Sequence, residues 1–197
     1  MTSKEALSEK ATEILESAQS LMQDKGYNGF SFRDVAAQVG IKSASIHYHF
    51  PTKGDLAKAA VRSYRDAFST LLADISALET TPRSKLRKYG DIFVDTLTVK
   101  HNACLCGILA SEAESLPDDV RHQVDGFFDD QRVWLSNIIE TGIKDGTFRS
   151  TIATQQFAIS FLAALEGAMI IARSTQKTEV LEQTINQMID LIKISKG

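Results

Sequence analysis

The sequence predicts an all-α protein of about nine helices, made of an N-terminal three-helix domain and a larger C-terminal helical domain. Apolar residues recur at spacings of three and four along almost all of the 197 residues, and the alternating pattern of a β-strand does not occur. Capping residues and turn glycines divide this pattern into separate segments. We place the boundary between the domains at residue 55, which gives an N-terminal domain of residues 1–55 and a C-terminal domain of residues 56–197.

The first predicted helix ends at Gly26, because glycine readily takes the left-handed conformation that terminates a helix. Apolar residues three or four positions apart form its buried side: Leu7, Ala11, Ile14, Leu15, Ala18, Leu21 and Met22.

Two short helices joined at a tight corner are predicted next. Ser31 and Asp34 form a capping box that starts the first of them, and Gly40 ends it. Ile41 supplies an apolar side chain that can hold the second helix, residues 42–50, against the first. This arrangement is typical of a helix-turn-helix.

A second capping box, Thr52 with Asp55, follows Pro51 and opens a long helix that ends near Leu78. Its expected buried face is one row of apolar or aromatic residues: Leu56, Ala60, Tyr64, Ala67, Leu71 and Ile75. Because this helix begins beside the helix-turn-helix and ends well beyond it, we expect it to link the two domains.

Five further helices are predicted from apolar spacing and from caps. They are, in order, a helix marked by Leu86, Tyr89, Phe93 and Leu97, a shorter one over residues 104–115, one opened by Ser115, Pro117 and Asp118 and ending at residues 145–146, and two last helices over residues 154–174 and 179–195.

The outward side chains of the helix over residues 42–50 can form hydrogen bonds and most are compact, which suits a helix that enters a DNA major groove about 12 Å wide. We expect four of them to contact base edges: Lys42, Ser43, Ser45 and His47. Four polar residues nearby are candidates for phosphate contacts: Ser31, Arg33, Tyr48 and Lys53. The net charge of −3 weighs mildly against DNA binding, but residues 1–62 hold 8 Lys and Arg against 7 Asp and Glu. The acidic excess therefore lies in the rest of the chain, and we expect a moderate salt dependence.

At residues 39–56, VGIKSASIHYHFPTKGDL, the sequence resembles the TetR family of bacterial transcriptional regulators. The shared features are the turn glycine, a short helix that ends in an aromatic and His-rich cluster, and a Pro-Thr-Lys segment that opens the next helix. The resemblance implies a cytoplasmic, ligand-responsive repressor that binds a near-palindromic double-stranded DNA operator as a homodimer. The alternative is a helical small-molecule carrier or enzyme whose N-terminal module docks a protein partner.

The C-terminal half contains residues that are most simply core but that could also line a cavity for a small-molecule inducer. These pocket candidates are Phe93, Cys104, Phe127, Trp134, Phe161, Leu165, Glu166 and Met169. Glu166 is the candidate polar group because it lies in the most apolar helix, and a solvent-facing or interface position is its other interpretation.

The last two helices also carry small and apolar residues that allow close helix approach. The family resemblance assigns them to a four-helix dimer interface: Ala164, Gly167, Ala168, Ile185, Met188, Ile189 and Ile192.

Cys104 and Cys106 follow His101 and Asn102 at a predicted helix start. The simplest interpretation is that Asn102 caps the helix and both cysteines are small core residues. The segment ACLCGILASEAESLPDDVR also resembles a branch of the TetR family in which a cysteine, matched here by Cys104, can sense electrophiles or oxidants. A zinc site formed by His101 and the two cysteines would lack a fourth ligand.

Other functions are not indicated by the sequence. It has no GxSxG, HExxH, GxGxxG or P-loop pattern, so we expect neither an enzyme nor a cofactor. His47 and His49 are two positions apart on a helix and point to opposite sides, so we expect no metal site there. The apolar run over residues 157–172 is too short to span a bilayer, and the N-terminus lacks a signal-peptide pattern. Two cysteines fit a reducing cytoplasm.

Overall fold

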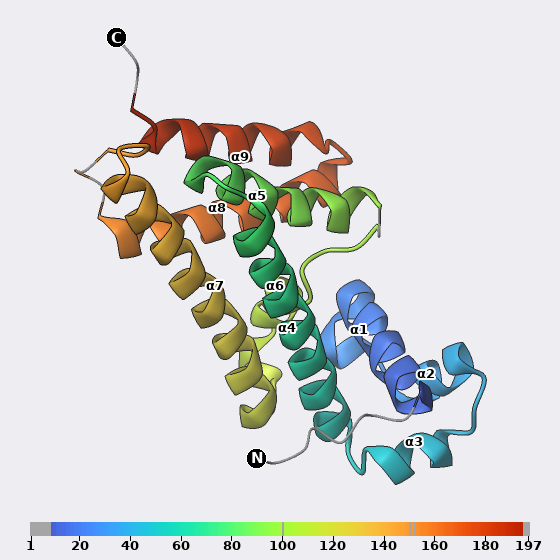
Figure 1. The fold of residues 1–197 in the computed structure, drawn as a ribbon. Helices are drawn as coiled ribbons and strands as arrows, with labels where there is room; N and C mark the ends of the chain where they lie inside the picture. The colour runs from blue at the N-terminus through green and yellow to red at the C-terminus, as the bar shows by residue number, and fades with distance from the viewer. Residues whose placement is uncertain (1–8, 100, 150, 152, 195–197) are drawn as a thin grey trace, which may run out of the picture. The chain divides into compact units, whose positions relative to one another are not determined.

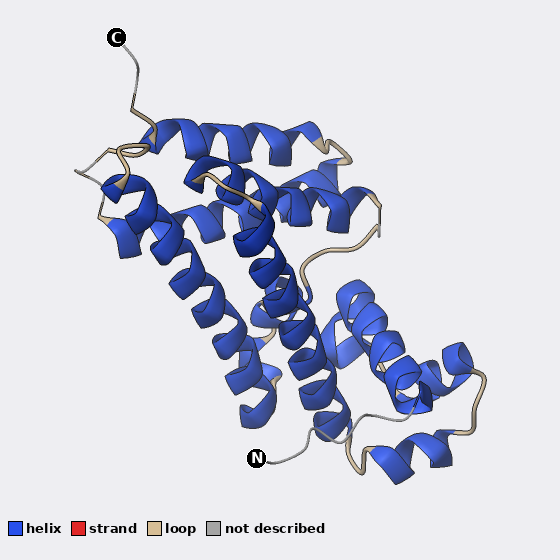
Figure 2. Cartoon of the chain, viewed as in Figure 1, coloured by secondary structure: helices blue, strands red, loops and turns tan. Residues whose placement is uncertain are grey.

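The computed structural model describes residues 9–99, 101–149, 151 and 153–194. Across these residues the chain forms nine α-helices and one 3₁₀-helix and no β-strand, which confirms the predicted all-α class (Figures 1 and 2). The elements are α1 (Glu9–Gly29), α2 (Phe32–Val39), α3 (Ser43–His49), α4 (Lys53–Leu78), α5 (Pro82–Thr98), α6 (Leu105–Ala110), η1 (Ala113–Ser115), α7 (Asp118–Lys144), α8 (Thr154–Thr175) and α9 (Glu179–Ile192).

The chain divides into two compact units. The first contains the described residues up to Asp66 together with Leu105–Val124, and the second contains Ala67–Cys104 and the described residues from Asp125 onward. Helices α4 and α7 each contribute to both units. The first unit therefore includes chain from beyond residue 55, and the predicted domain division at that residue stays a prediction.

Helices α2 and α3 form the predicted helix-turn-helix within the first unit, and α1 packs against α2. Ser31 caps α2, because its hydroxyl oxygen accepts a hydrogen bond from the Asp34 backbone N–H at 3.3 Å. Gly40 ends α2 in the left-handed conformation, with φ 72°, and its N–H donates to the Ala36 carbonyl. Buried apolar side chains close the core: Ile14, Leu15, Ala18, Met22, Phe30, Val35, Ile46 and Phe50.

The end of α1 differs from the prediction. Gly26 has φ 72° and ψ −179°, which breaks the helical geometry, but a short helical turn continues to Gly29. The expected apolar stripe is buried from Ala11 to Met22 except for Leu21, which is half-buried. Leu7 lies outside the described residues.

The predicted start of α4 is confirmed. The Asp55 N–H donates to Thr52 Oγ1 at 3.0 Å, and the Thr52 N–H donates to Asp55 Oδ2 at 3.1 Å, which completes a capping box. Similar reciprocal bonds between Thr81 and Ser84 start α5 at Pro82, a helix start that the sequence analysis left unassigned.

The predicted buried face of α4 is wrong in its second half. Phe68 and Leu72 are buried, whereas the expected Ala67 and Leu71 are exposed. After Tyr64 the buried residues are Phe68 and Leu72, each four positions further on. The prediction instead placed the next buried residue at Ala67, three positions after Tyr64. Both steps are compatible with 3.6 residues per turn, so spacing alone could not decide between them.

The sixth helix is also shorter than predicted. The segment over residues 104–115 contains α6, a turn and η1, because the N–H groups of Ser111 and Glu112 bond to carbonyls three residues earlier, Ile108 and Leu109. Such bonds tighten the backbone and end the α-helix.

Helices α5, α8 and α9 pack together in the second unit (Figure 1). The approach of α5 to α9 is close at Gly90, where a Cβ atom would lie 2.7 Å from Ile185 Cγ2. The largest wholly buried side chains of this unit are aromatic: Tyr89, Phe93, Phe127, Phe148 and Phe161.

Candidate nucleic-acid interface and buried polar cluster

Helix α3 is anchored on its inner side and polar on its outer side. Ile46 has no exposed surface, which fixes α3 in the core of the first unit. Lys42, Ser45 and His47 are exposed and Ser43 is half-buried. All four predicted base-contact residues thus keep some exposed surface, three of them on α3 and Lys42 at its N-cap, while the assignment to DNA bases stays a prediction.

His47 is less free than the sequence suggested. Its ring packs edge-on against Phe32 of α2, with 4.3 Å between the ring centroids, and its Nδ1 lies 3.3 Å from the Pro51 carbonyl oxygen. Because a carbonyl only accepts hydrogen bonds, this contact favours the proton on Nδ1 and leaves Nε2 to accept one. His47 therefore also joins α2 to α3.

The predicted phosphate contacts fall into two groups. Arg33 is exposed, and Tyr48 is 86% exposed. The Ser31 hydroxyl already accepts from the Asp34 N–H and donates to Asp34 Oδ2 at 2.6 Å. Ser31 is thus engaged in the helix cap, whereas Arg33 and Tyr48 present accessible side chains.

Lys53 is held between two aromatic rings. Its Nζ lies 4.7 Å from the ring centroids of both Tyr27 and Phe30. Burial lowers the pKa of Lys53, and the negative charges of Glu112 and Asp34 partly oppose this effect. The ammonium group is therefore positioned by the fold.

Glu112, in the turn after α6, binds the end of α1 within the first unit. Glu112 Oε2 accepts from the Asn28 backbone N–H at 3.0 Å and from Asn28 Nδ2 at 2.7 Å. A Cβ atom at Gly26 would lie 1.6 Å from Glu112 Oε1, so only glycine leaves room for this contact. A second link joins Lys58 Nζ to Asp119 Oδ2 at 2.6 Å. Neither link could be predicted from the sequence, because no local pattern pairs residues about 60 to 85 positions apart.

The second unit contains an aromatic group centred on Tyr89. Its ring centroid lies 5.4 Å from that of Phe93, 6.0 Å from that of Phe161 and 5.7 Å from that of Trp134, which stacks on it at 22°. The Tyr89 hydroxyl donates to Gln131 Oε1 at 2.6 Å. Burial raises the pKa of Tyr89 well above its ordinary value, with smaller contributions from Glu166 and Cys104.

Glu166 brings a carboxylate into this apolar region. Its Oε1 atom has no exposed surface and no hydrogen-bond partner in the described part of the chain, although the residue as a whole is half-buried. Burial raises the pKa of Glu166 to about 7, and a hydrogen bond with Cys104 acts in the opposite direction. The Cys104 backbone N–H in turn lies 3.1 Å from Met169 Sδ.

The structure thus brings most of the predicted pocket residues together. Phe93, Trp134 and Phe161 surround Tyr89. Cys104 interacts with both Glu166 and Met169, and the charge of Glu166 helps to raise the pKa of Tyr89. Phe127 contacts Phe68, which in turn contacts Tyr89, and Leu165 is wholly buried on α8. Their role as a ligand pocket stays a prediction. The sequence analysis did not single out Tyr89 or Gln131 as pocket residues, although a polar residue inside an apolar row of α7 was a usable signal.

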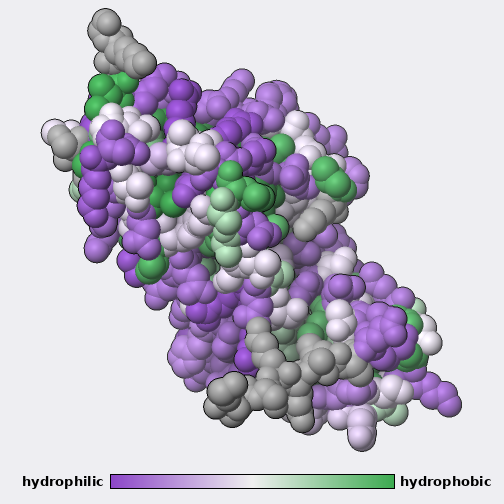
Figure 3. Space-filling view, viewed as in Figure 1, coloured by the Kyte–Doolittle hydropathy of each residue, from purple (hydrophilic) through white to green (hydrophobic). Residues whose placement is uncertain are grey.

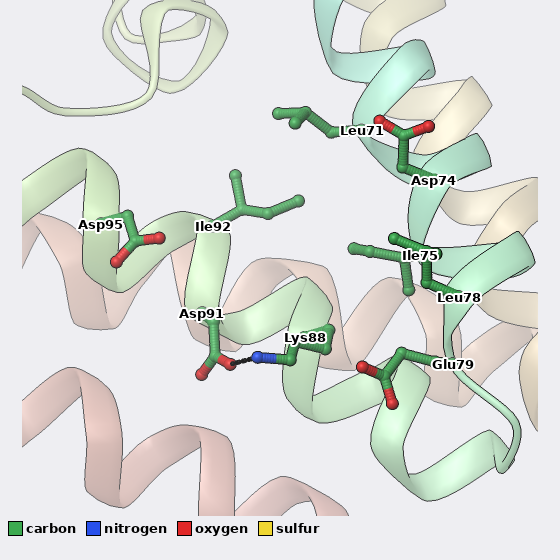
Figure 4. Close-up of a pocket in the computed structure, with 9 residues that line it drawn as sticks. All are labelled: Leu71, Asp74, Ile75, Leu78, Glu79, Lys88, Asp91, Ile92 and Asp95. Atoms are coloured by element: carbon green, nitrogen blue, oxygen red, sulfur yellow. Dashed lines mark ion pairs between the residues drawn. The ribbon is translucent and has the colours of Figure 1, made fainter.

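A groove of about 260 Å³ between the end of α4 and α5 was also missed (Figure 4). Leu71, Ile75, Leu78 and Ile92 supply its apolar side chains, and five charged residues surround them: Asp74, Glu79, Lys88, Asp91 and Asp95. Asp91 is neutralised by Lys88 at 3.5 Å and by Arg87 at 2.9 Å. The remaining carboxylates give the groove an acidic rim.

The predicted dimer residues are largely internal. Ala168, Ile185, Ile189 and Ile192 are buried within the chain itself, and Ala164, Gly167 and Met188 are half-buried. Those four side chains pack inside their own chain, and their assignment to a dimer interface stays a prediction. Apolar side chains about half exposed instead lie on the outer sides of α8 and α9: Ile159, Ile170, Ile171 and Leu191. The face drawn in Figure 3 is mostly hydrophilic, with hydrophobic residues in separate patches.

Two further expectations concern metals and membranes. No group of three or more potential ligands is placed to hold a metal ion within the described ranges. Helix α8 is long and apolar enough by composition to cross a membrane, the one such helix among the residues described, and 39% of its apolar window is buried. A core helix satisfies the same criteria, so the expected absence of a membrane partner stays a prediction.

The chain matches two domain families. Residues 14–60 match the bacterial regulatory proteins of the tetR family, and residues 82–188 match the tetracyclin repressor-like C-terminal domain. The HTH-type transcriptional repressor KstR2 of Rhodococcus jostii is 27% identical over 78% of this chain and 74% of its own length. A TetR family regulator from Agrobacterium tumefaciens is 33% identical, with a TM-score of 0.91 over 94% of this chain and 98% of that one. A regulator from Saccharomonospora viridis, solved in complex with choline, is 25% identical with a TM-score of 0.82, over 96% of this chain and 100% of that one. The C-terminal match alone covers more than half of the chain, which therefore belongs to the TetR family of transcriptional regulators.

Proposed function

We propose that this protein is a ligand-responsive repressor that binds a near-palindromic operator as a homodimer in the cytoplasm. The observation that carries the proposal is the outer side of α3, where Ser45 and His47 are exposed next to the exposed N-cap residue Lys42, on a helix fixed by the buried Ile46. Its relatives are named as transcriptional repressors, which makes catalysis by this chain an unsupported alternative.

One helix of seven residues reads only a few base pairs, so specificity requires two half-sites about 34 Å apart or a multiple of that distance. Lys42, Ser43, Ser45 and His47 would contact base edges in each half-site. Arg33 and Tyr48 would bind phosphates, with Lys53 held nearby by its two aromatic rings.

Retardation of the DNA that flanks the gene tests this proposal. Ser45→Ala should change the preference among operator variants, because a lost base contact affects one position of the half-site. Lys177→Ala, which removes an exposed charge from the second unit, is the matched control and should change neither preference nor affinity. Equal retardation of operator and unrelated DNA by the unmodified protein would refute specific binding.

The dimer would be formed by the outer sides of α8 and α9. Ile159, Ile170 and Leu191 would be buried there against a second copy, with Gly167 allowing close approach. A Cβ atom at Gly167 meets nothing within 4 Å, so Gly167→Arg should leave the chain folded and produce monomers in sedimentation at micromolar concentration. Ile189→Arg should instead unfold the second unit, because Ile189 is only 3% exposed.

The ligand would be a small organic molecule held near Tyr89 and Glu166. The Saccharomonospora viridis regulator in complex with choline supports a small-molecule site in this fold. A ligand that fits only one conformer would shift the population away from the form that spans both half-sites. Helices α4 and α7, which contribute to both units, would carry that shift along the chain.

A noncovalent ligand is favoured over covalent sensing at Cys104. Cys104 is 4% exposed and forms a hydrogen bond with the Glu166 side chain, so an electrophile has little access to its thiol. Slow and equal alkylation of Cys104 and Cys106 would support this proposal. Rapid labelling of Cys104 with release of operator DNA would establish the sensor instead.

A further inference from the structure

One oxygen of the Glu166 carboxylate, Oε1, accepts no hydrogen bond from the described residues. Around it, the Tyr89 hydroxyl donates to Gln131, and the Cys104 backbone N–H faces the Met169 sulfur. Glu166 also interacts with Cys104, but Oε1 is buried with no donor among the described groups. An unsatisfied buried carboxylate oxygen destabilises the fold, so a bound donor would be favourable there.

The chemistry of the surroundings indicates which class of hydrogen-bond donor the site would bind. A carboxylate repels an anion, and its strongest hydrogen bonds are with charged N–H groups. The aromatic rings of Phe93, Trp134 and Phe161 gather around Tyr89, whose pKa the charge of Glu166 helps to raise, so apolar aromatic side chains lie near the carboxylate. A cation with at least one N–H and an apolar body satisfies both parts of the site.

We infer that this cluster binds a small protonated amine, whose N–H donates to Glu166 Oε1 and whose apolar part packs against the rings around Tyr89. The inference rests on the proposed ligand-responsive function and names the chemical class of the ligand. The site would favour primary and secondary amines over quaternary ammonium ions, because a quaternary ammonium ion has no N–H to donate to Oε1.

The local charges make amine binding depend on pH. The titratable groups that act on Glu166 or respond to it are Cys104, in the segment before α6, and Tyr89 on α5. Burial raises the pKa of Tyr89 above its ordinary value, so Tyr89 carries no charge between pH 6 and 8. Burial is the main reason that the pKa of Glu166 is raised to about 7. A bound ammonium would favour the ionised carboxylate, so binding near pH 7 should release about half a proton. Affinity should therefore increase as pH rises from 6 to 8.

Calorimetry on the full chain without DNA tests the inference directly. Pentylammonium chloride is the probe, and 1-pentanol, pentanoate and tetramethylammonium are the comparison compounds. We expect pentylammonium to bind at least about tenfold more tightly than each of them, and titrations in two buffers of different ionisation enthalpy should show the proton release. Equal binding of pentanol, or binding without proton release, would overturn the inference.

Two variants locate the site. Glu166→Gln should weaken pentylammonium binding at least about tenfold and abolish proton release, since the amide carries no charge. The double variant Asp74→Asn with Asp95→Asn removes two of the three carboxylates that make the rim of the groove in Figure 4 acidic, and it should bind the amine as the unmodified protein does. Loss of binding in the double variant with retention in Glu166→Gln would place the amine in the groove and refute the Glu166 site.

Operator retardation without amine keeps the two proposals separate. Specific retardation together with absent amine binding would remove the amine inference and leave the repressor intact. Amine binding without specific retardation would refute the proposed function, because the ligand site would then exist on a protein that does not read DNA.

Discussion

Glu166→Gln should stabilise the protein at high pH. The folded state raises the pKa of this carboxyl from 4.5 to about 7, mainly because the carboxylate is buried. Between these two values the unfolded chain has lost the proton and the folded chain retains it, so the free energy of unfolding falls as pH rises. At 1.36 kcal/mol per pKa unit, the ionised carboxylate costs about 3 kcal/mol above pH 8. Glutamine has the same shape and no charge to desolvate.

Urea unfolding at one protein concentration provides the measurement. Relative to the unmodified protein, Glu166→Gln should gain about 3 kcal/mol at pH 8.5 and only about 1 kcal/mol at pH 5, where the native carboxyl is already protonated. Glu140→Gln, an exposed acid on α7, is the matched control and should change stability little at either pH. A gain that is the same at both pH values would show that the Glu166 charge is not the cause.

Three other substitutions test separate parts of the structure. Lys53→Ala should weaken specific and nonspecific DNA binding together and lower the salt slope by about 1, measured by retardation across a salt series, and unchanged affinity would remove Lys53 from the interface. Glu112→Ala should destabilise the first unit by about 1–2 kcal/mol in urea unfolding, because the Asn28 backbone N–H and Nδ2 lose their acceptor, and a smaller effect would mean that water replaces it. Gly90→Ala should lower the free energy of unfolding by about 1–3 kcal/mol through its contact with Ile185, and wild-type stability would show that α5 and α9 separate easily.

The helix-turn-helix was predictable because its signals are local. Ser31 caps α2 by accepting a hydrogen bond from an N–H three residues away, and Gly40 ends the helix through its own positive φ. The start and the end of α2 therefore each depend on a few neighbouring residues. The Thr52–Asp55 box that opens α4 is of the same kind. Such features can be read from composition and spacing without knowledge of the rest of the fold.

The faces of the later helices depend on tertiary packing and were less predictable. The family resemblance assigns Ile185 and Ile189 to a dimer interface, and in the structure both apolar side chains are buried inside their own chain. Spacing shows that a helix has an apolar side and does not show which partner covers it. Ile189 is buried and Ile170 is half-exposed although both are isoleucines on apolar helices. The difference follows from the packing among α5, α8 and α9.

The junction between Cys104 and Leu105 connects the candidate ligand site to the DNA-binding unit through the covalent chain. Cys104 is the last residue of a second-unit segment and interacts with Glu166, while Leu105 begins α6 in the first unit. Helix α6 packs against α1, and Glu112 in the following turn accepts two hydrogen bonds from Asn28 at the end of α1. We propose that a ligand bound at Glu166 acts on Cys104 and on the helix that follows it. Because α1 supports the core in which Ile46 anchors α3, this route would reach α3 without any contact between the ligand and DNA.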